Sequence, residues 1–187
     1  MQANLIKMKF IICFGLFILI GLFLTPKTKA EVVDSSSTGF TVKSDQFAKV
    51  PPDSLFKYLV SNVGNWWNPE HTWSGNSSNL SIQPFANGCF CETLANGGSV
   101  RHMTVVYVIP GKLLRMEGGI GPLQMQAVTG SMTFEITPAP SGSKISLKYA
   151  VGGYIPGGAQ KWASLVNRVL VEQVQRLVDY AETGKSH

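Results

Sequence analysis

Two ionisable side chains, His102 and Glu92, are the best candidates for proton transfer in this chain. His102 lies in a run of alternating residues, and Glu92 lies in the run before it, which we expect to form the neighbouring strand. A neutral histidine that faces a cavity positions a carbonyl or hydroxyl group, or acts as an acid or base. A hydrogen bond across the sheet is the more common role of a buried histidine, and a cross-strand pair is the ordinary explanation of Glu92. The sequence shows no nucleophile motif, phosphate-binding loop or histidine-rich metal spacing, so it indicates no catalytic residue, no metal and no cofactor.

A second candidate site is the tryptophan-rich segment at residues 65–79, which reads N-W-W-N-P-E-H-T-W-S-G-N-S-S-N. Indole rings give large flat contact surfaces for an aromatic or carbohydrate ligand. Trp66 and Trp67 are adjacent and cannot easily face one pocket together, so we expect one of them to pack in the core. We include Trp67 among the ligand-binding candidates, and we expect His71 to help fold the segment.

Cys89 and Cys91 are separated by one residue, so they lie on the same face of a strand. An oxidising compartment favours a disulfide, although this geometry along one strand is strained. A metal site needs more ligands than this pair, and no nearby histidine supplies them. Packing as small apolar side chains in or against a core is the interpretation that we favour.

The first 30 residues are typical of a secretory signal peptide. Lys7 and Lys9 precede an apolar run over residues 10–24, and a short polar stretch then ends at the small residue Ala30. The run has fifteen residues, fewer than the roughly 18–20 that span a bilayer, and an uncleaved anchor is the alternative. We therefore expect an exported protein, periplasmic or secreted, with no membrane span after cleavage.

Removal of this segment changes the charge balance. Four of the 16 basic residues and none of the 11 acidic residues precede residue 31, so the remainder carries 12 basic and 11 acidic side chains. This near-neutral balance gives no basis for nucleic-acid binding. Residues 31–38 are polar and rich in serine, and we expect them to form a disordered leader. Residues 39–184 suffice for one domain with a sizeable core.

The expected elements follow the order strand, helix, a meander of strands and a long helix. Asn-Gly and Pro-Gly turns separate the short alternating runs, a pattern typical of hairpins. The expected strands are residues 40–50, 80–85, 89–94, 99–109, 113–117, 127–137 and 144–151, and the expected helices begin near residues 51 and 159.

The C-terminal helix, residues 159–183, has no internal glycine or proline and has one apolar face. Trp162, Val166 and Val169 lie on that face, and Gln173 lies in its middle. A buried amide without a partner costs roughly 1–3 kcal/mol, so Gln173 on this face indicates a lined cavity rather than a fully dry core. We therefore expect a cavity between this helix and the sheet.

Five local motifs stand out in the chain: W-W-N-P-E-H-T-W-S-G, G-C-F-C-E-T, V-x-Y-V-I-P-G-K-L-L-R-M, G-P-L-Q and V-G-G-Y-I-P-G-G. These motifs and the order of elements resemble the START-like (SRPBCC) superfamily, which includes the birch-pollen allergen, polyketide cyclases and chaperone-ATPase activators, and in particular an exported bacterial branch of it. The resemblance covers residues 39–183. It implies an α+β helix-grip fold, in which a curved antiparallel sheet wraps around a long C-terminal helix.

Taken together, the residues and the resemblance predict an exported protein that holds a small hydrophobic or amphipathic ligand, a lipid or an aromatic compound, between sheet and helix. Two alternatives stay open. A polyketide cyclase or dehydratase would use His102 or Glu92 as its acid or base, and a chaperone-type protein would bind a protein partner. The predicted ligand-binding residues are Trp162, Val166, Val169, Gln173, His102, Val106 and Trp67.

Overall fold

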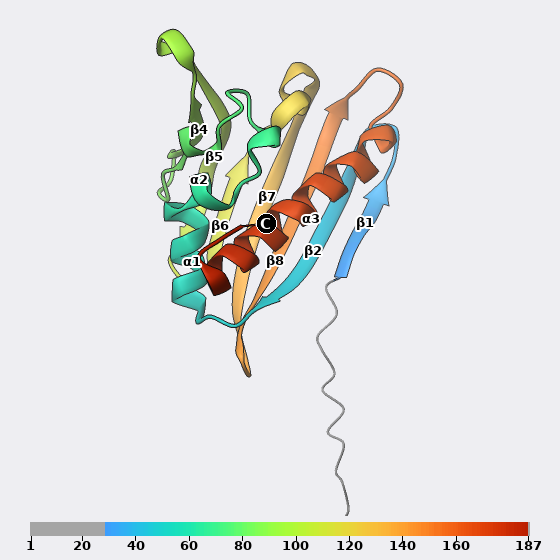
Figure 1. Cartoon of the computed structure of the whole chain (residues 1–187). Helices are drawn as coiled ribbons and strands as arrows, with labels where there is room; N and C mark the ends of the chain where they lie inside the picture. The colour runs from blue at the N-terminus through green and yellow to red at the C-terminus, as the bar shows by residue number, and fades with distance from the viewer. Residues whose placement is uncertain (1–28, 187) are drawn as a thin grey trace, which may run out of the picture.

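A computed structural model describes residues 29–186, and Figure 1 shows their arrangement. The predicted signal peptide, residues 1–30, falls almost wholly on residues 1–28, which lie outside the described part. Its cleavage therefore stays a prediction. In the described part, no helix is long and apolar enough to cross a membrane.

Eight strands of the described residues form one antiparallel sheet in the order β1-β2-β8-β7-β6-β5-β4-β3. The chain therefore forms a meander from β3 to β8, and β2 joins the meander through β8. The strands are β1 (Lys29–Ser35), β2 (Gly39–Ala48), β3 (Leu80–Ile82), β4 (Cys89–Thr93), β5 (Ser99–Ile109), β6 (Leu113–Glu117), β7 (Ala127–Ala139) and β8 (Gly142–Tyr154).

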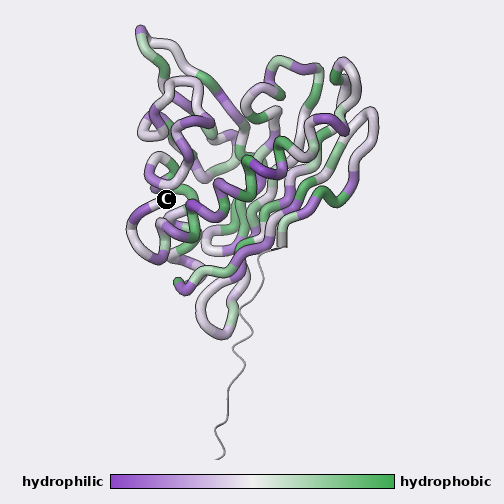
Figure 2. Tube along the Cα trace, turned by 45° about the vertical axis from the view of Figure 1, so that its right-hand side comes forward, coloured by the Kyte–Doolittle hydropathy of each residue, from purple (hydrophilic) through white to green (hydrophobic). Residues whose placement is uncertain are grey.

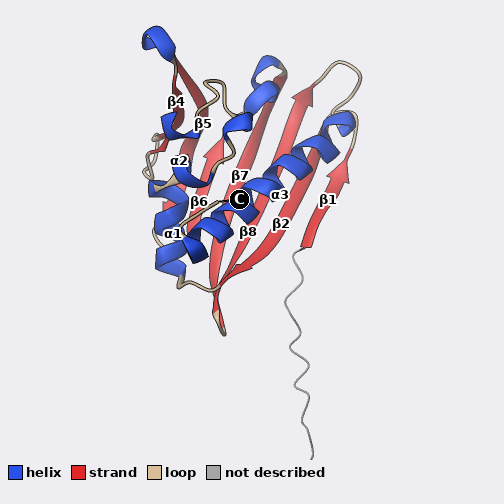
Figure 3. Cartoon of the chain, in the orientation of Figure 1, coloured by secondary structure: helices blue, strands red, loops and turns tan. Residues whose placement is uncertain are grey.

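The helices pack on one side of this sheet, as Figures 1 and 3 show. The long helix α3 contacts β2 and β1 of the sheet and also the shorter helices α1 and α2. Apolar segments gather between α3 and the sheet in Figure 2, which is where the core lies. The helical segments are α1 (Pro52–Ser61), α2 (Val63–Trp66), α3 (Gln160–Thr183) and the short 3-10 turns η1 (Pro69–His71), η2 (Ser77–Asn79), η3 (Ala95–Gly97) and η4 (Gly121–Met125).

The amphipathic pattern of the C-terminal segment accounts for the position of α3. Leu170, Val174 and Leu177 of this helix are buried to 2% exposure or less, while residues on the opposite side face solvent. The helix ends at Gly184, whose φ of 74° lies in the left-handed region and whose N–H donates to the Tyr180 carbonyl at 2.8 Å. The structure confirms the predicted α+β helix-grip architecture.

The prediction of a disordered leader at residues 31–38 was wrong. Most of this segment belongs to strand β1, which pairs with β2 from Lys29↔Asp45 to Ser35↔Phe40. Without β1, the outer edge of β2 would expose a row of unpaired backbone groups, and pairing satisfies them. The polar, serine-rich composition of residues 31–38 is not typical of a strand, so the sequence did not predict β1.

Candidate functional site

A cavity of about 410 Å³ lies beside the first half of α3. Its wall has three parts: a tryptophan loop (residues 67–74) that follows α2, the segment 120–123 that enters η4, and α3 itself. No strand residue is among the described residues that line this cavity, so the prediction that the sheet forms its second wall was wrong. The lining residues are Trp67, Glu70, His71, Thr72, Trp73, Ile120, Gly121, Pro122, Leu123, Trp162, Leu165, Val166, Arg168, Val169 and Leu170. Most of these side chains are apolar, and the charged ones, Glu70 and Arg168, are exposed.

Four of the seven predicted ligand-binding residues line this cavity: Trp67, Trp162, Val166 and Val169. Trp162, Val166 and Val169 are half-buried on the helix face that the sequence pattern indicated. Trp67 is only 4% exposed, and its Nε1 donates to the His71 carbonyl at 3.1 Å. These four residues meet in space as expected, and their contact with a ligand stays a prediction.

Gln173 is buried on α3, but it does not line the cavity. Its Oε1 accepts a hydrogen bond from the backbone N–H of Asn68 at 2.8 Å, which fixes the start of the tryptophan loop to the helix. Glu172, the preceding residue, accepts from the Asn68 side chain and lies 3.6 Å from His71 Nε2. The interpretation of Gln173 as a polar group facing the cavity was therefore wrong, because a loop distant in sequence supplies its partner.

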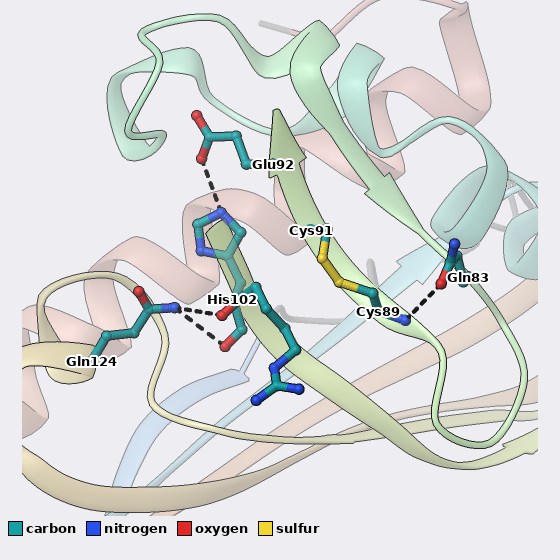
Figure 4. Close-up of a disulfide and its surroundings, with 7 residues drawn as sticks. Gln83, Cys89, Cys91, Glu92, His102 and Gln124 are labelled. Carbon is teal, nitrogen blue, oxygen red and sulfur yellow. Dashed lines mark hydrogen bonds and ion pairs between the residues drawn. A yellow bond between two sulfur atoms is a disulfide. The ribbon is translucent and has the colours of Figure 1, made fainter. Parts of the chain in front are cut away.

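His102 and Glu92 form the pair that the sequence allowed (Figure 4). His102 Nε2 lies 2.9 Å from Glu92 Oε2, and both side chains are almost fully buried. Glu92 also accepts the backbone N–H groups of Trp73 and Ser74. The carboxylate therefore holds the far end of the tryptophan loop, as Gln173 holds its start.

The pKa values of this pair reflect its surroundings. Burial raises the pKa of Glu92, but hydrogen bonds from Ser74, Trp73 and His102 outweigh burial and leave that pKa below its ordinary value. Burial lowers the pKa of His102, and the contact with Glu92 offsets this only in part. At neutral pH the pair is therefore a carboxylate and a neutral imidazole, whose Nε2 proton points at the carboxylate. His102 Nδ1 has no hydrogen-bond partner among the described residues.

Neither His102 nor Glu92 is among the residues that line the cavity. A row of aromatic rings connects them to its wall: Phe90 lies 5.0 Å from the His102 ring and 5.3 Å from the Trp67 ring, measured between ring centres. Trp66 continues the row at 5.5 Å from Trp67 and is buried in the core. The His102–Glu92 pair therefore contacts the tryptophan loop and the aromatic rings next to the cavity wall, although it does not line the cavity itself.

Val106 is 38% exposed and does not line the cavity, so its inclusion in the site was wrong. Sequence reasoning assumed unbroken alternation along β5. The structure instead has register shifts in both ladders of this strand, which leave His102 opposite no residue of β4 and Val106 opposite no residue of β6. Each extra residue reverses the facing of those that follow, so His102 points inward and Val106 outward.

Tyr149 holds the segment 120–123 of the cavity wall in place, and the sequence analysis did not single out this residue. This side chain is fully buried, its hydroxyl donates to the Gly118 carbonyl at 2.8 Å, and it accepts from the Ile120 N–H at 3.2 Å. Burial raises the pKa of Tyr149 to about 12, so the hydroxyl stays protonated. It fixes the segment that carries Ile120 and Leu123 into the cavity wall. The only signal in the sequence was the G-P-L-Q motif, which marks this loop but not its partner.

Cys89 and Cys91 are joined in a disulfide (Figure 4). The favoured interpretation, two small apolar side chains against a core, was therefore wrong, since both cysteines are half-buried and the buried residue is Phe90 between them. Among the described residues, no group of three or more histidine, cysteine or acidic side chains is placed to hold a metal ion.

No protein-family model matches the chain, and no curated protein matches its sequence. Solved structures do match it in fold. The Aha1 dimer from Colwellia psychrerythraea has a TM-score of 0.57 at 15% identity, covering 78% of this chain and 98% of that one. CalU16 from Micromonospora echinospora has a TM-score of 0.53 at 10% identity, covering 85% and 88% of the two chains. DynU16, a protein of the dynemicin biosynthetic locus, has a TM-score of 0.56 at 17% identity, covering 78% and 48%.

Identities this low show the fold alone. These structures share the helix-grip fold of this chain, the fold that the resemblance to the START-like (SRPBCC) superfamily implied. Proteins with a common fold carry many different activities, so the function has to be argued from the site of this chain.

Proposed function

We propose that this protein binds a small, mostly apolar molecule in the cavity between the tryptophan loop, the segment 120–123 and α3. The observation that carries the proposal is the cavity of about 410 Å³ with three indole side chains, Trp67, Trp73 and Trp162, in its wall. Ligand sites are typically concave, largely apolar and about 300–1,000 Å³ in volume, with a few polar groups that set orientation. This cavity has those properties.

The lining favours a lipid or an aromatic compound. Indole rings bury large flat surfaces and pack well against other rings, and the aliphatic side chains of Ile120, Leu123 and Val166 add further apolar contact. Glu70, His71 and Arg168 supply polar groups at the wall, so an amphipathic ligand would place its polar end beside them. The apolar part would then lie against the tryptophans.

A binding role accounts for the polar residues better than a cyclase or dehydratase. An acid or base has to reach the substrate, within hydrogen-bond distance or through one water. The Nε2 atom of His102 is engaged by Glu92, and neither residue lines the cavity. Both oxygens of Glu92 already accept hydrogen bonds, from the backbone N–H groups of the loop and from the imidazole. These contacts support a structural role for the pair.

We also propose that the protein is exported to the periplasm or secreted, on the strength of the charged and apolar pattern of residues 1–30. N-terminal sequencing of the protein recovered from its host tests this. Export with cleavage predicts Glu31 as the first residue, and recovery of Met1 in a membrane fraction would contradict it.

Titration with a fluorescent apolar probe such as N-phenyl-1-naphthylamine tests the binding proposal. Val166→Trp fills the cavity from α3, and Ser164→Trp places the same side chain at an exposed position two residues away. We expect the first variant to weaken probe binding at least about tenfold, or about 1.4 kcal/mol, and the second to leave it unchanged. Thermal unfolding of both variants checks that each is folded. Equal affinity in the wild type and the Val166→Trp variant would refute the proposal.

A further inference from the structure

The disulfide Cys89–Cys91 lies on the face of β4 that points away from the core. Phe90 between the two cysteines is 1% exposed and therefore points inward, whereas both cysteines are half-buried. The two Cα atoms are 5.3 Å apart, and the sequence separation is two residues. Solvent therefore has access to a disulfide that joins two positions of a single strand.

Such a bond adds little to the stability of the fold. The stabilisation that a disulfide gives grows with the length of the loop that it closes, and this loop contains a single intervening residue. Strand β4 is already held on both sides, because it pairs with β3 from Leu80↔Glu92 to Ile82↔Phe90 and with β5 from Cys89↔Thr104 to Thr93↔Ser99. Opening the bond leaves these ladders in place.

A basic residue lies on the strand next to one of the two cysteines. Arg101 of β5 is the cross-strand partner of Cys91, and its side chain is exposed on the same face. The other cross-strand partners on this face, Ser81 beside Cys91 and Thr104 beside Cys89, are uncharged. The nearest acidic residue in this row, Glu117, lies one strand further away, beyond Thr104. A cation beside a cysteine favours its thiolate form, which is both the nucleophile and the better leaving group.

We propose that Cys89–Cys91 is an exchangeable disulfide, a site at which the folded protein reacts with small-molecule or protein thiols. An external thiolate attacks Sγ of Cys89, the sulfur–sulfur bond breaks, and its electron pair leaves on Sγ of Cys91, whose cross-strand partner is Arg101. A second external thiolate attacks the external sulfur of the mixed disulfide and releases Cys89 as a thiolate. Two external thiols are oxidised to one disulfide, the two cysteines are reduced, and the protons of the external thiols pass to solvent or to the new thiolates.

The test is thiol labelling of the full chain, with peptide mass spectrometry to separate these residues from Cys13. Air-oxidised protein should label at neither Cys89 nor Cys91, and dithiothreitol without denaturant should free both while near-ultraviolet circular dichroism shows the native fold. Free thiols in the oxidised protein would overturn the proposal, as would a bond that is reduced only after unfolding in urea.

The role of Arg101 is tested by the rate of iodoacetamide alkylation of the reduced protein against pH. We expect Arg101→Gln to move the midpoint of the profile to higher pH and to slow alkylation of Cys91 at neutral pH by about threefold. Lys112→Gln removes a positive charge from an exposed turn elsewhere and should leave the profile unchanged. Identical profiles for the Arg101→Gln variant and the wild type would show that Arg101 does not activate the site.

Discussion

Replacement of Glu92 by glutamine is expected to loosen the tryptophan loop, because it removes one acceptor from a site with three donors. In the wild-type protein Oε1 accepts from the Ser74 N–H, and Oε2 accepts from the Trp73 N–H at 3.1 Å and from His102 Nε2 at 2.9 Å. A glutamine side chain offers one acceptor oxygen in the same space. Its amide group would face a donor instead of accepting from it.

The size of the effect follows from burial of the carboxylate. A hydrogen bond to a charged group contributes about 1.5–3 kcal/mol, and a buried donor left without its acceptor costs about 1–3 kcal/mol. Since glutamine keeps one acceptor, we expect Glu92→Gln to lower the free energy of unfolding by about 2–4 kcal/mol. Urea unfolding followed by tryptophan fluorescence measures this value.

The neighbouring exposed residue Thr93 provides the control. Thr93→Ala should change the free energy of unfolding by about 0.5 kcal/mol or less. The Glu92→Gln variant should also bind an apolar probe more weakly, because the loop that carries Trp73 forms part of the cavity wall. A Glu92→Gln variant as stable as the Thr93→Ala variant would refute the claim that this carboxylate holds the loop.

Three further predictions concern the supports of the cavity. Gln173→Leu should lower the free energy of unfolding by about 1–3 kcal/mol in urea titration, since it leaves a backbone N–H of the loop without its acceptor; equal or higher stability would contradict this. Tyr149→Phe should cost about 1–2 kcal/mol in the same assay and weaken probe binding, and unchanged binding would show that the Gly118 contact does not shape the wall. The free energy of unfolding should fall as pH drops below about 6.5, because the pKa of His102 is lowered in the folded protein and the unfolded chain binds that proton first. It should fall further below about 4.5, where the unfolded chain protonates Glu92 before the folded protein does. A His102→Asn variant should lose the upper part of this pH dependence.

Periodicity in the sequence predicted the order of the strands and helices, and the resemblance to the START-like superfamily implied how they pack. The helical spacing of Trp162, Val166 and Val169 placed these side chains on one face, and the turns at glycine separated the strands of the meander. The G-P-L-Q motif stood out in the sequence, and the structure places Gly121, Pro122 and Leu123 in the cavity wall. The helix face, the turns and the G-P-L-Q loop each depend on residues close together in the sequence, so short sequence patterns are enough to predict them.

Most of the failed predictions depend on how one segment of the chain meets another. Val106 was assigned to the wrong face because an extra residue in a strand shifts the ladder register without a clear local signature. The partner of Gln173 lies 105 residues earlier in the chain, in a loop whose path no periodicity describes. The pairing of Cys89 with Cys91 was considered and not favoured, because the spacing alone suggested strain.

Native mass spectrometry of the protein purified from its own host tests the central claim most directly. We expect the wild-type protein to carry one small apolar molecule, seen as a discrete added mass that organic extraction removes. The Val166→Trp variant should lack this mass, and the Ser164→Trp variant should retain it. Wild-type protein of bare polypeptide mass, or the same added mass on the Val166→Trp variant, would contradict the assignment of the cavity as a ligand site.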